Sequence, residues 1–402
     1  MPQIRELGAA DIADAEVLSA EAFGRAPNPT ATPMPGARYL GAFVADQLAA
    51  KLTLREYHSH FHGTTVATCG IGGVTVAAEH RGAGLVRELF PYAFELAREQ
   101  GAVVSGLFPS ATGIYRGFGY ETITDEREMT VDTADLASAT GPGRHEVRVR
   151  RAGLDDVERV RECYDRWGAS HNGALTRRGP SFPADDQAVL DGVTSIFLAE
   201  IDDHAVGYCS WQRGQGFGAE AQLRIVDLVS TDADVTAALL RTVGSFAMVA
   251  PRTRIRASGS DPTHWLRRAG QSDQGRPSSY QLSILDVPAA FGVLPPPPVT
   301  ATDLTITVQG RHGLASVPGR YRLSIDPSVG VGAERLGEAE RLGESGSSDE
   351  PTFSPRGLAV WWSGAVGMAE LRLAGLVEGP TEHDAVLEAI VPRRAVRILD
   401  HY

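Results

Sequence analysis

The chain has 402 residues, of which 43% are hydrophobic and 22% charged, and it carries a formal net charge of −12 at pH 7. This composition is typical of a globular protein and excludes a fibrous or largely disordered chain. The acidic excess argues against nucleic acid as the main partner, because phosphate contacts need clustered lysines and arginines. The length exceeds what one hydrophobic core usually supports, so we expect two or three domains.

The three cysteines, Cys69, Cys163 and Cys209, are widely separated and lack the spacing of metal ligands. We expect them to be buried apolar residues of a protein in a reducing compartment. The polar start after Met1 has no apolar leader segment, and no apolar run reaches the length that crosses a membrane. The expectation is therefore a cytoplasmic protein without a membrane partner.

The first part of the chain has the pattern of a helix followed by three strands. Apolar residues recur at helical spacing from residue 9 to residue 23, and strand patterns follow at 39–44, 48–57 and 65–76. Gly41 and the pair Gly72-Gly73 interrupt these strands, which marks places where the backbone bends or approaches a ligand.

A glycine-bearing turn then connects the third strand to an amphipathic helix. The strand ends with Val74-Thr75-Val76, the turn is Arg81-Gly82-Ala83-Gly84, and the helical spacing of apolar residues begins at Leu85. Free backbone N–H groups and the helix dipole point to one place at such a turn, so it predicts an anion site. A strand at 102–108 precedes the loop 110–120, on which we expect Tyr115 to carry out chemistry.

The order of helix, antiparallel strands, glycine turn, helix and strand predicts a mixed sheet, with one more strand at 128–131. A second unit begins at Val147 and repeats this order, with helices at 155–167 and 234–248 and strands at 196–201, 205–212 and 223–229. Asp232 and Asp234 stand where its glycine turn would be. Their carboxylates would repel pyrophosphate, so we expect this unit to bind no nucleotide.

A third unit begins near Val287. Its predicted strands lie at 304–308, 319–325, 357–362 and 371–376, and its predicted helix at 384–390. The apolar run 395–399 precedes Tyr402, the last residue of the sequence. Such a run argues that the tail docks on the protein instead of fraying.

The segment Arg81-Gly82-Ala83-Gly84-Leu85-Val86 resembles the acyl-CoA-binding turn of the GNAT N-acetyltransferase superfamily, with Val86 at a position that usually holds a small residue. The longer run from Ser110 to Tyr120 has the pattern Gly-Ile-Tyr-x-x-Phe-Gly-Tyr. This run is similar to that of the Eis-type (enhanced intracellular survival) acetyltransferases within the superfamily.

The resemblance implies an α+β fold in which tandem GNAT-like mixed α/β domains precede a C-terminal domain like sterol carrier protein 2. Residues 1–145 would form the acetyltransferase domain with the acetyl-CoA site, and residues 146–286 a degenerate GNAT-like domain. Residues 287–402 would form the sterol-carrier-like domain and supply the C-terminal carboxylate. Members of the family assemble as homo-hexamers, which we also expect for this chain.

The resemblance further implies acetyl-CoA as the acyl donor, an amine as the acceptor and no metal. Tyr115 would be the general acid that protonates the departing thiolate, and the main-chain carboxylate of Tyr402 the general base toward the amine. Backbone groups of the strand would hold the pantetheine arm, and amides of the turn the pyrophosphate. The implied cofactor-binding residues are Val74, Thr75, Val76, Arg81, Gly82, Ala83, Gly84, Leu85, Val86, Arg87, Ser110 and Ala111.

We therefore expect an N-acetyltransferase that acts by direct attack in a ternary complex on a primary amine of a small molecule, such as an aminoglycoside or a polyamine, or on a lysine. Arg25 follows the first helix, in a region that faces the acceptor pocket in this family, and a cation there would repel aminoglycosides. The alternative is a catalytically silent protein that binds CoA or a lipid.

A second candidate site consists of three alternating histidines, His58, His60 and His62. One face of a strand would carry all three, and such a group is either a metal site or a solvated cluster that lines a loop. The sequence does not name the acceptor.

Overall fold

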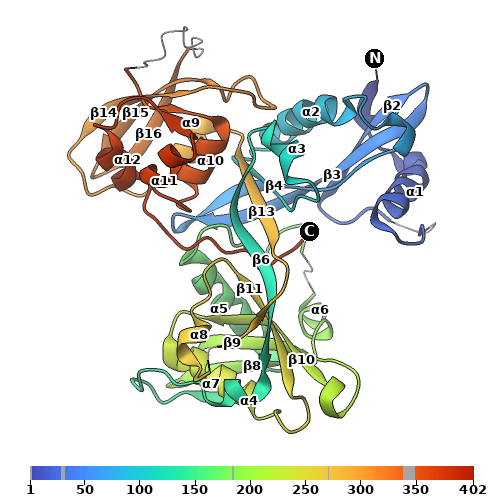
Figure 1. The fold of residues 1–402 in the computed structure, drawn as a ribbon, viewed down its shortest axis with the longest axis vertical. Coiled ribbons are helices and arrows are strands. Elements are labelled where there is room, and N and C mark those ends of the chain that lie inside the picture. The colour runs from blue at the N-terminus through green and yellow to red at the C-terminus, as the bar shows by residue number, and fades with distance from the viewer. Residues whose placement is uncertain (1, 29–31, 183–184, 270, 338–348) are drawn as a thin grey trace.

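A computed structural model describes residues 2–28, 32–182, 185–269, 271–337 and 349–402. The described residues form three units, which we call N-terminal, middle and C-terminal (Figure 1). The N-terminal and C-terminal units lie side by side, and two long strands lead from them into the middle unit below. The C-terminus lies at the junction of the units.

The N-terminal unit contains the predicted helix, the three strands, the glycine turn and the second helix. Its elements are β1 (Gln3–Glu6), α1 (Ile12–Phe23), β2 (Ala37–Val44), β3 (Gln47–Phe61), β4 (Thr64–Val76), α2 (Leu85–Glu99), β5 (Val104–Leu107), α3 (Thr112–Arg116) and β6 (Glu121–Asp132). Helix α2 forms because its apolar side chains share one stripe, which packs on the sheet through residues such as Leu89, Phe90 and Phe94.

The middle unit confirms the predicted hairpin, strand and helices. Its elements are α4 (Thr133–Ala137), β7 (Arg148–Arg151), α5 (Val157–Ala169), α6 (Asp186–Asp191), β8 (Ser195–Ile201), β9 (His204–Arg213), β10 (Gln222–Ser230), α7 (Ala233–Gly244), β11 (Arg252–Ser258), α8 (Thr263–Leu266) and β12 (Asp273–Gln274). At the position of the missing glycine turn, Asp232 caps α7 by accepting the N–H groups of Asp234 and Val235.

One continuous sheet joins the first two units. The strand order is β1-β2-β3-β4-β5-β13-β6-β11-β10-β9-β8-β7, with β12 beside β6. Strand β13 (Ser278–Ile284) follows the middle unit in the sequence but lies between β5 and β6. Strand β6 pairs with β13 up to Glu126 and with β11 from Glu126 onward.

The hydrophobic cores follow this exchange of strands. Met129 and Val131 of β6 belong to the core of the middle unit, whereas Tyr280 and Leu282 of β13 belong to the core of the N-terminal unit. The domains expected from the sequence, 1–145, 146–286 and 287–402, are consecutive segments, so this exchange of strands was not predicted. Because each unit needs a strand from outside its own stretch of chain, the two units fold as partners.

The C-terminal unit is a second sheet, of order β16-β15-β14-β17-β18, with four helices. Its elements are α9 (Val287–Phe291), β14 (Thr302–Val308), β15 (Gly319–Asp326), β16 (Gly330–Gly337), β17 (Thr352–Phe353), α10 (Pro355–Trp362), α11 (Met368–Leu373), β18 (Val377–Glu378) and α12 (Asp384–Ile390). Its core is continuous with that of the N-terminal unit, and the ring of Trp362 lies 4.8 Å from that of Phe61.

Two strands predicted for the C-terminal unit are wrong. Residues 357–362 lie in α10 and most of residues 371–376 in and after α11. Helix α10 starts with Ser354, whose hydroxyl accepts the Gly357 N–H, followed by Pro355 in the first turn. Apart from Arg356, the residues of this helix are buried, and a short apolar run of this kind fits strand and helix equally well.

Within the part of the chain that the structure describes, no helix combines the length and apolar character needed to cross a bilayer.

Candidate functional site

The predicted interruption of the third strand at Gly72-Gly73 is confirmed as a β-bulge in β4. The pairing of β3 with β4 shifts between Lys51 and Thr53, so that Gly73 and Val74 together oppose a single residue of β3. Gly73 has a φ of 57°, which a residue with a Cβ atom rarely adopts. The bulge therefore depends on this glycine.

Beyond Gly70, β4 has an open side. Strand β5 pairs with β4 in parallel only as far as this residue. The N–H of Ala77 donates to the Ala49 carbonyl of β3 at 2.8 Å. Alternate residues of a strand direct their N–H groups to opposite sides, so those of Val74 and Val76 point to the open side. Two donors are thus available there to a carbonyl oxygen.

The glycine turn leads into the N-terminus of α2 with unpaired amides. Gly82 and Gly84 have φ values of 81° and 82°, and a Cβ atom on either would meet no atom within 4 Å. The N–H groups of Gly82, Gly84, Leu85 and Val86 donate to no acceptor among the described residues. Open space in front of unpaired N–H groups at a helix N-terminus fits a diphosphate.

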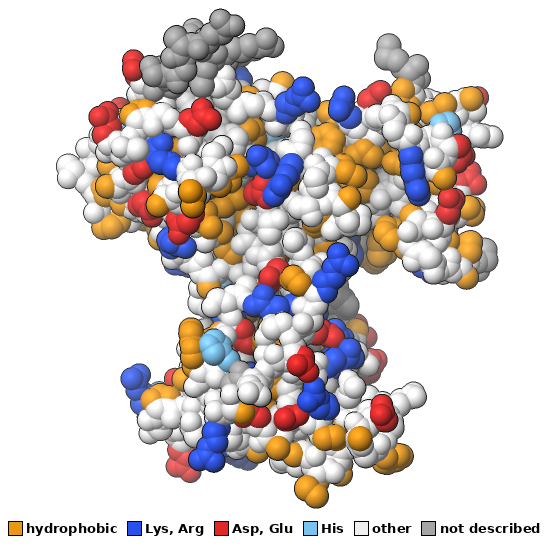
Figure 2. Space-filling model, in the orientation of Figure 1, with side chains coloured by type: hydrophobic (Ala, Val, Ile, Leu, Met, Phe, Trp, Pro, Cys, Tyr) orange, Lys and Arg blue, Asp and Glu red, His pale blue; other side chains and the backbone are white. Residues whose placement is uncertain are grey.

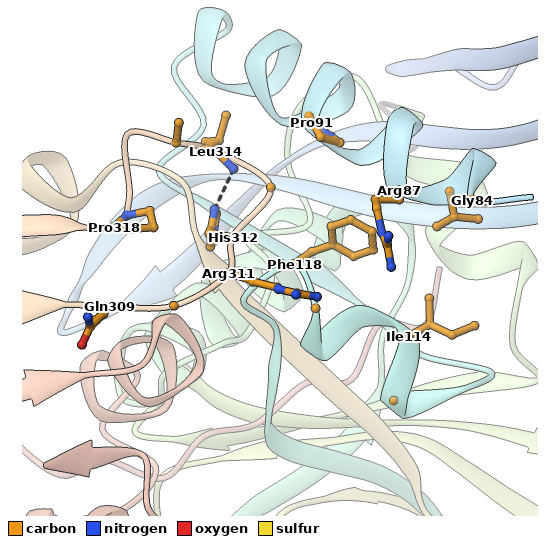
Figure 3. A pocket seen from close by; sticks show the side chains of 16 residues that line it. Gly84, Arg87, Pro91, Ile114, Phe118, Gln309, Arg311, His312, Leu314 and Pro318 are labelled. Carbon is orange, nitrogen blue, oxygen red and sulfur yellow. Dashed lines mark hydrogen bonds between the residues drawn. The ribbon is translucent and has the colours of Figure 1, made fainter. Parts of the chain in front are cut away.

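A cavity of about 1130 Å³ adjoins this turn (Figure 3). Helices α2 and α3 form one side and the segment 309–318 of the C-terminal unit the other. Figure 2 shows basic side chains around the junction of these two units. Ile114 lines the cavity with 53% of its surface exposed. An exposed apolar side chain beside unpaired amides suits a ligand that is part apolar and part anionic.

Tyr115 lies on α3 with only 5% of its surface exposed. Its ring packs against Phe90 of α2, with centroids 5.7 Å apart, and against Tyr120 at 6.3 Å. Burial raises the pKa of Tyr115 above its usual value, and a hydrogen bond with Ser110 opposes part of this change. The phenol therefore keeps its proton at neutral pH and can donate it.

Tyr115 and Tyr402 lie on opposite faces of the sheet. On the α2 face, the hydroxyls of Ser105 and Tyr120 are 2.6 Å apart, and Tyr120 packs against Tyr115. Gly106 follows Ser105 in β5 and so faces the other side. A Cβ atom on Gly106 would lie 2.8 Å from the Tyr402 hydroxyl.

The ring of Tyr402 is held in an aromatic pocket. Its centroid lies 4.8 Å from that of Tyr57 and 5.6 Å from that of Phe108, and its hydroxyl donates to the Tyr280 hydroxyl at 3.2 Å. The main-chain carboxyl carbon lies 3.7 Å from where Gly72 would carry a Cβ atom. The carboxylate of Tyr402 therefore borders the bulge.

The predicted docking of the tail is confirmed. Ile398 is fully buried, and its N–H donates to the Ser258 hydroxyl at 2.9 Å. The Asp400 carboxylate accepts hydrogen bonds from Arg177 at 2.9 Å and from Tyr164 at 3.1 Å. The tail thus runs between the N-terminal and middle units and ends at the bulge.

A buried lysine lies beside the bulge. Lys51 of β3 is only 4% exposed, and its ammonium donates to the Gly73 carbonyl oxygen at 3.4 Å. Burial lowers the pKa of Lys51 to about 8, with Glu16 opposing and Arg25 adding to the change. The side chain is therefore a cation at neutral pH.

Arg25 is paired. Its guanidinium donates to both oxygens of Glu16, one at 3.0 Å, and the hydrogen bond lowers the pKa of Glu16 to about 2. The expected repulsion of cationic acceptors by Arg25 is thus offset by Glu16.

Two of the three histidines, His60 and His62, are buried, so the interpretation of the cluster as solvated is wrong for these two, whereas His58 is half-buried. His60 is 8% and His62 5% exposed. The His62 ring nitrogen Nε2 lies 2.7 Å from the Trp362 carbonyl oxygen, and burial lowers the pKa of His62 to about 4. Among the described residues, no group of three or more His, Cys, Asp or Glu side chains could hold a metal ion. All three cysteines are buried, as predicted.

Three features of the site were not predicted from the sequence: Tyr280, the segment 309–318 and Lys51. Tyr280 and the segment 309–318 come from far along the chain and carry no local signal. Lys51 does carry one, because it is the only lysine in 402 residues and stands between the apolar residues Ala50 and Leu52.

The chain is similar to known N-acetyltransferases. Residues 3–123 match the family model described as acetyltransferase (GNAT) domain. An uncharacterised N-acetyltransferase of Streptomyces avermitilis is 28% identical over 321 residues, which are 73% of each chain. The N-acetyltransferase Eis of Mycobacterium tuberculosis is 34% identical over 116 residues, 27% of this chain and 28% of that protein.

Two solved structures match the whole chain. A GCN5-related N-acetyltransferase of Kribbella flavida superposes with a TM-score of 0.78 at 26% identity, covering 100% of this chain and 99% of the other. Eis1 of Mycobacterium abscessus superposes with a TM-score of 0.74 at 17% identity, covering 100% of both chains. These similarities confirm the predicted mixed α/β fold with tandem GNAT-like domains.

Proposed function

This chain belongs to the Eis-type family of GNAT N-acetyltransferases, and we propose that it transfers the acetyl group of acetyl-CoA to a primary amine of a small molecule. The observation that supports this most directly is the position of the Tyr402 carboxylate beside the bulge of β4. A proton acceptor there lies next to the strand segment whose two amides would bind the thioester.

The proposed reaction uses groups on both faces of the sheet. The amides of Val74 and Val76 donate to the thioester carbonyl oxygen and stabilise the charge that develops on it. The Tyr402 carboxylate takes a proton from the ammonium of the acceptor, directly or through water, and the freed amine attacks the carbonyl carbon. As the C–N bond forms and the C–S bond breaks, Tyr115 gives its phenolic proton to the departing sulfur. The nitrogen then loses its second proton through water to the Tyr115 phenolate, which restores the general acid.

The turn and the cavity would hold the rest of the acyl donor. We propose that the amides of Gly82, Gly84, Leu85 and Val86 bind the diphosphate. Arg81 and Ala83 belong to the same glycine turn and Arg87 to the first turn of α2, so these three residues would also border the diphosphate. Ser110 and Ala111 precede α3 on the opposite side of the opening between β4 and β5. Thr75 has a buried hydroxyl with no partner among the described residues, so a bound substrate could engage it.

The charges near the bulge favour an acceptor with a single amine. Lys51 places a positive charge there, and Glu16 is already neutralised by Arg25. A polyamine or an aminoglycoside would bring several further positive charges next to the Lys51 ammonium. We therefore propose a monoamine as the acceptor class.

The test is release of CoA thiol from acetyl-CoA in the presence of monoamines, polyamines, aminoglycosides and a lysine peptide. We expect release with at least one monoamine, confirmed by mass spectrometry of the acetylated product. Binding of CoA without thiol release from any amine would overturn the proposal and support a catalytically silent binding protein. Faster turnover of polyamines than of monoamines would overturn the acceptor class alone.

Two further properties are proposed from the family resemblance. A five-stranded sheet with helices agrees with a sterol-carrier-like C-terminal domain. A homo-hexamer would have six times the chain mass of 42.8 kDa. Light scattering of the purified protein tests this, and a monomer mass would contradict it.

A further inference from the structure

A loop of the C-terminal unit forms one wall of the cavity next to the glycine turn. Residues 309–318 connect β14 to β15 and face Gly84 and Arg87 across the cavity (Figure 3). The acetyl-donor site of the N-terminal unit is thereby bounded by a segment more than 200 positions later in the chain.

The loop is fixed to the N-terminal unit by His312. Its Nε2–H donates to the Ser283 hydroxyl at 2.8 Å, and its Nδ1 accepts the Leu314 N–H at 2.9 Å. The ring packs 5.5 Å from Phe94 of α2, and a Cβ atom on Gly119 would lie 2.2 Å from it. Burial lowers the pKa of His312 to about 3, so the ring is neutral. The neighbouring residue, Arg311, is therefore held at a fixed place.

The cavity is positively charged and open to an anion. Arg311 and Arg87 are exposed and point into it from opposite walls (Figure 3), and neither guanidinium makes a hydrogen bond or ion pair with any residue that the structure describes. None of the 16 lining residues is acidic. The cavity also receives the N-terminus of α2, whose dipole adds to the positive potential.

We propose that Arg311 binds the 3′-phosphate of the acyl-CoA substrate. This rests on the proposed function, which places the diphosphate at the glycine turn next to Arg87. The 3′-phosphate sits on the ribose beyond the diphosphate, away from the thioester, and Arg311 lies on the wall across from the turn. A phosphate monoester carries up to two charges and suits the forked guanidinium. The C-terminal unit thereby completes the donor site.

The test compares the affinity of CoA with that of 3′-dephospho-CoA by calorimetry. The wild-type protein should bind CoA about tenfold more tightly, as expected for a charge-assisted contact to phosphate. Arg311→Gln should bind both ligands equally, with the affinity for 3′-dephospho-CoA unchanged. Arg322→Gln, a change at another exposed arginine of the same unit, should leave both affinities unchanged.

Each other outcome overturns the proposal in a distinct way. If Arg311→Gln keeps the preference for CoA, Arg311 does not bind the 3′-phosphate. If Arg311→Gln weakens the binding of CoA and of 3′-dephospho-CoA by the same factor, Arg311 contacts a different part of the ligand. If the wild-type protein binds neither ligand, the proposed function fails with it.

A second inference comes from Lys51, the only lysine of the chain. Its ammonium donates to the Gly73 carbonyl oxygen, and that carbonyl shares a peptide group with the Val74 N–H. A cation on the oxygen end of a peptide group strengthens the hydrogen bond that its N–H end can donate. We infer that Lys51 is a positioning residue that polarises the Val74 amide toward the thioester carbonyl oxygen. This also rests on the proposed function.

The infrared stretching frequency of the thioester carbonyl measures this polarisation directly. With ¹³C-labelled acetyl-CoA, binding to the wild-type protein should shift the frequency down, and Lys51→Met should reduce that shift. We expect Lys51→Met to lower kcat about tenfold while KM for acetyl-CoA changes less than about twofold. Lys51→Arg should restore part of the frequency shift, because it restores a cation.

An unchanged carbonyl frequency in Lys51→Met would overturn the second inference, whatever its kcat. A loss of acetyl-CoA binding in that variant would also overturn it, because a role in polarisation leaves binding in place. Absence of a carbonyl shift in the wild-type protein would instead count against the proposed function of the bulge.

Discussion

The hydroxyl of Tyr402 donates a hydrogen bond of 3.2 Å to the hydroxyl of Tyr280. Tyr402 is the last residue of the sequence, and Tyr280 lies on β13, the strand that returns from the middle unit into the N-terminal sheet. This bond therefore joins two segments that follow the middle unit in the sequence. Together with the packing of the Tyr402 ring against Tyr57 and Phe108, it keeps the carboxylate beside the bulge.

The two hydroxyls meet over Gly106 of β5, which predicts a strong effect of Gly106→Ala. The added Cβ atom would lie 2.0 Å from the Tyr280 hydroxyl and 2.8 Å from that of Tyr402. Both rings must move, so we expect a loss of about 1–3 kcal/mol in the free energy of unfolding and a drop in kcat of at least about tenfold. Urea unfolding and thiol-release kinetics measure the two effects.

The matched control is Gly332→Ala in β16, where a Cβ atom would meet no atom within 4 Å. This variant should keep wild-type turnover. Equal turnover in Gly106→Ala and Gly332→Ala would show that the position of the Tyr402 ring does not affect the reaction.

Tyr115→Phe tests the general acid. The substitution keeps the packing against Phe90 and Tyr120 and removes only the phenolic hydroxyl. We expect kcat to fall by about 100-fold, in the range usual for general acid catalysis, with KM for acetyl-CoA within about threefold of wild type. Tyr92→Phe, at an exposed tyrosine of α2, should change neither constant. A larger effect on KM than on kcat would make Tyr115 a binding residue.

Local patterns in the sequence predict the N-terminal unit well. The helix, the strands, the interruption at Gly72-Gly73 and the glycine turn each follow from the spacing of apolar residues and glycines within a few positions. The hairpin of β8 and β9 in the middle unit is predicted in the same way from the turn at Asp202-Asp203, where both residues have positive φ. These elements owe their form to neighbours in the chain.

The site itself depends on contacts that no local pattern contains. The insertion of β13 beside β5 brings Tyr280 to Gly106, and the loop with Arg311 reaches α2 only through packing of the C-terminal unit. The helices α10 and α11 were predicted as strands because their apolar runs fit either form, and burial between units decides between them. Unlike these features, Lys51 carries a signal in the sequence, because it is the only lysine of the chain.

Extension of the chain by one glycine after Tyr402 tests the general base. The added residue replaces the carboxylate at the bulge with a neutral amide, so we expect kcat to fall by about 100-fold. Tyr402→Phe keeps the carboxylate and removes only the 3.2 Å hydrogen bond to Tyr280, so its kcat should stay within about fivefold of wild type. Equal rates for the extended and the wild-type chain would contradict a role for the carboxylate.

Lys51→Met should stabilise the protein at neutral pH while it slows the reaction. Burial lowers the pKa of Lys51 in the folded chain from 10.5 to about 8. Below pH 8 both the folded and the unfolded chain carry the proton, and the folded chain bears the full cost of burying the charge. That difference in pKa corresponds to about 3 kcal/mol. Removing the charge should therefore raise the free energy of unfolding at pH 7 by about 1–3 kcal/mol.

The sign of the pH dependence separates this effect from a change in packing. Between pH 8 and 10.5 the folded chain loses the Lys51 proton before the unfolded chain does, so the stability of the wild-type protein rises relative to that of Lys51→Met. The advantage of the variant should thus shrink by about 3 kcal/mol across this window, measured by urea unfolding at several pH values. Only one lysine exists in the chain, so no other lysine contributes to the difference. A gap between the two proteins that stays constant from pH 7 to pH 10.5 would show that the Lys51 charge costs no stability, and that the ammonium is not buried in the folded protein.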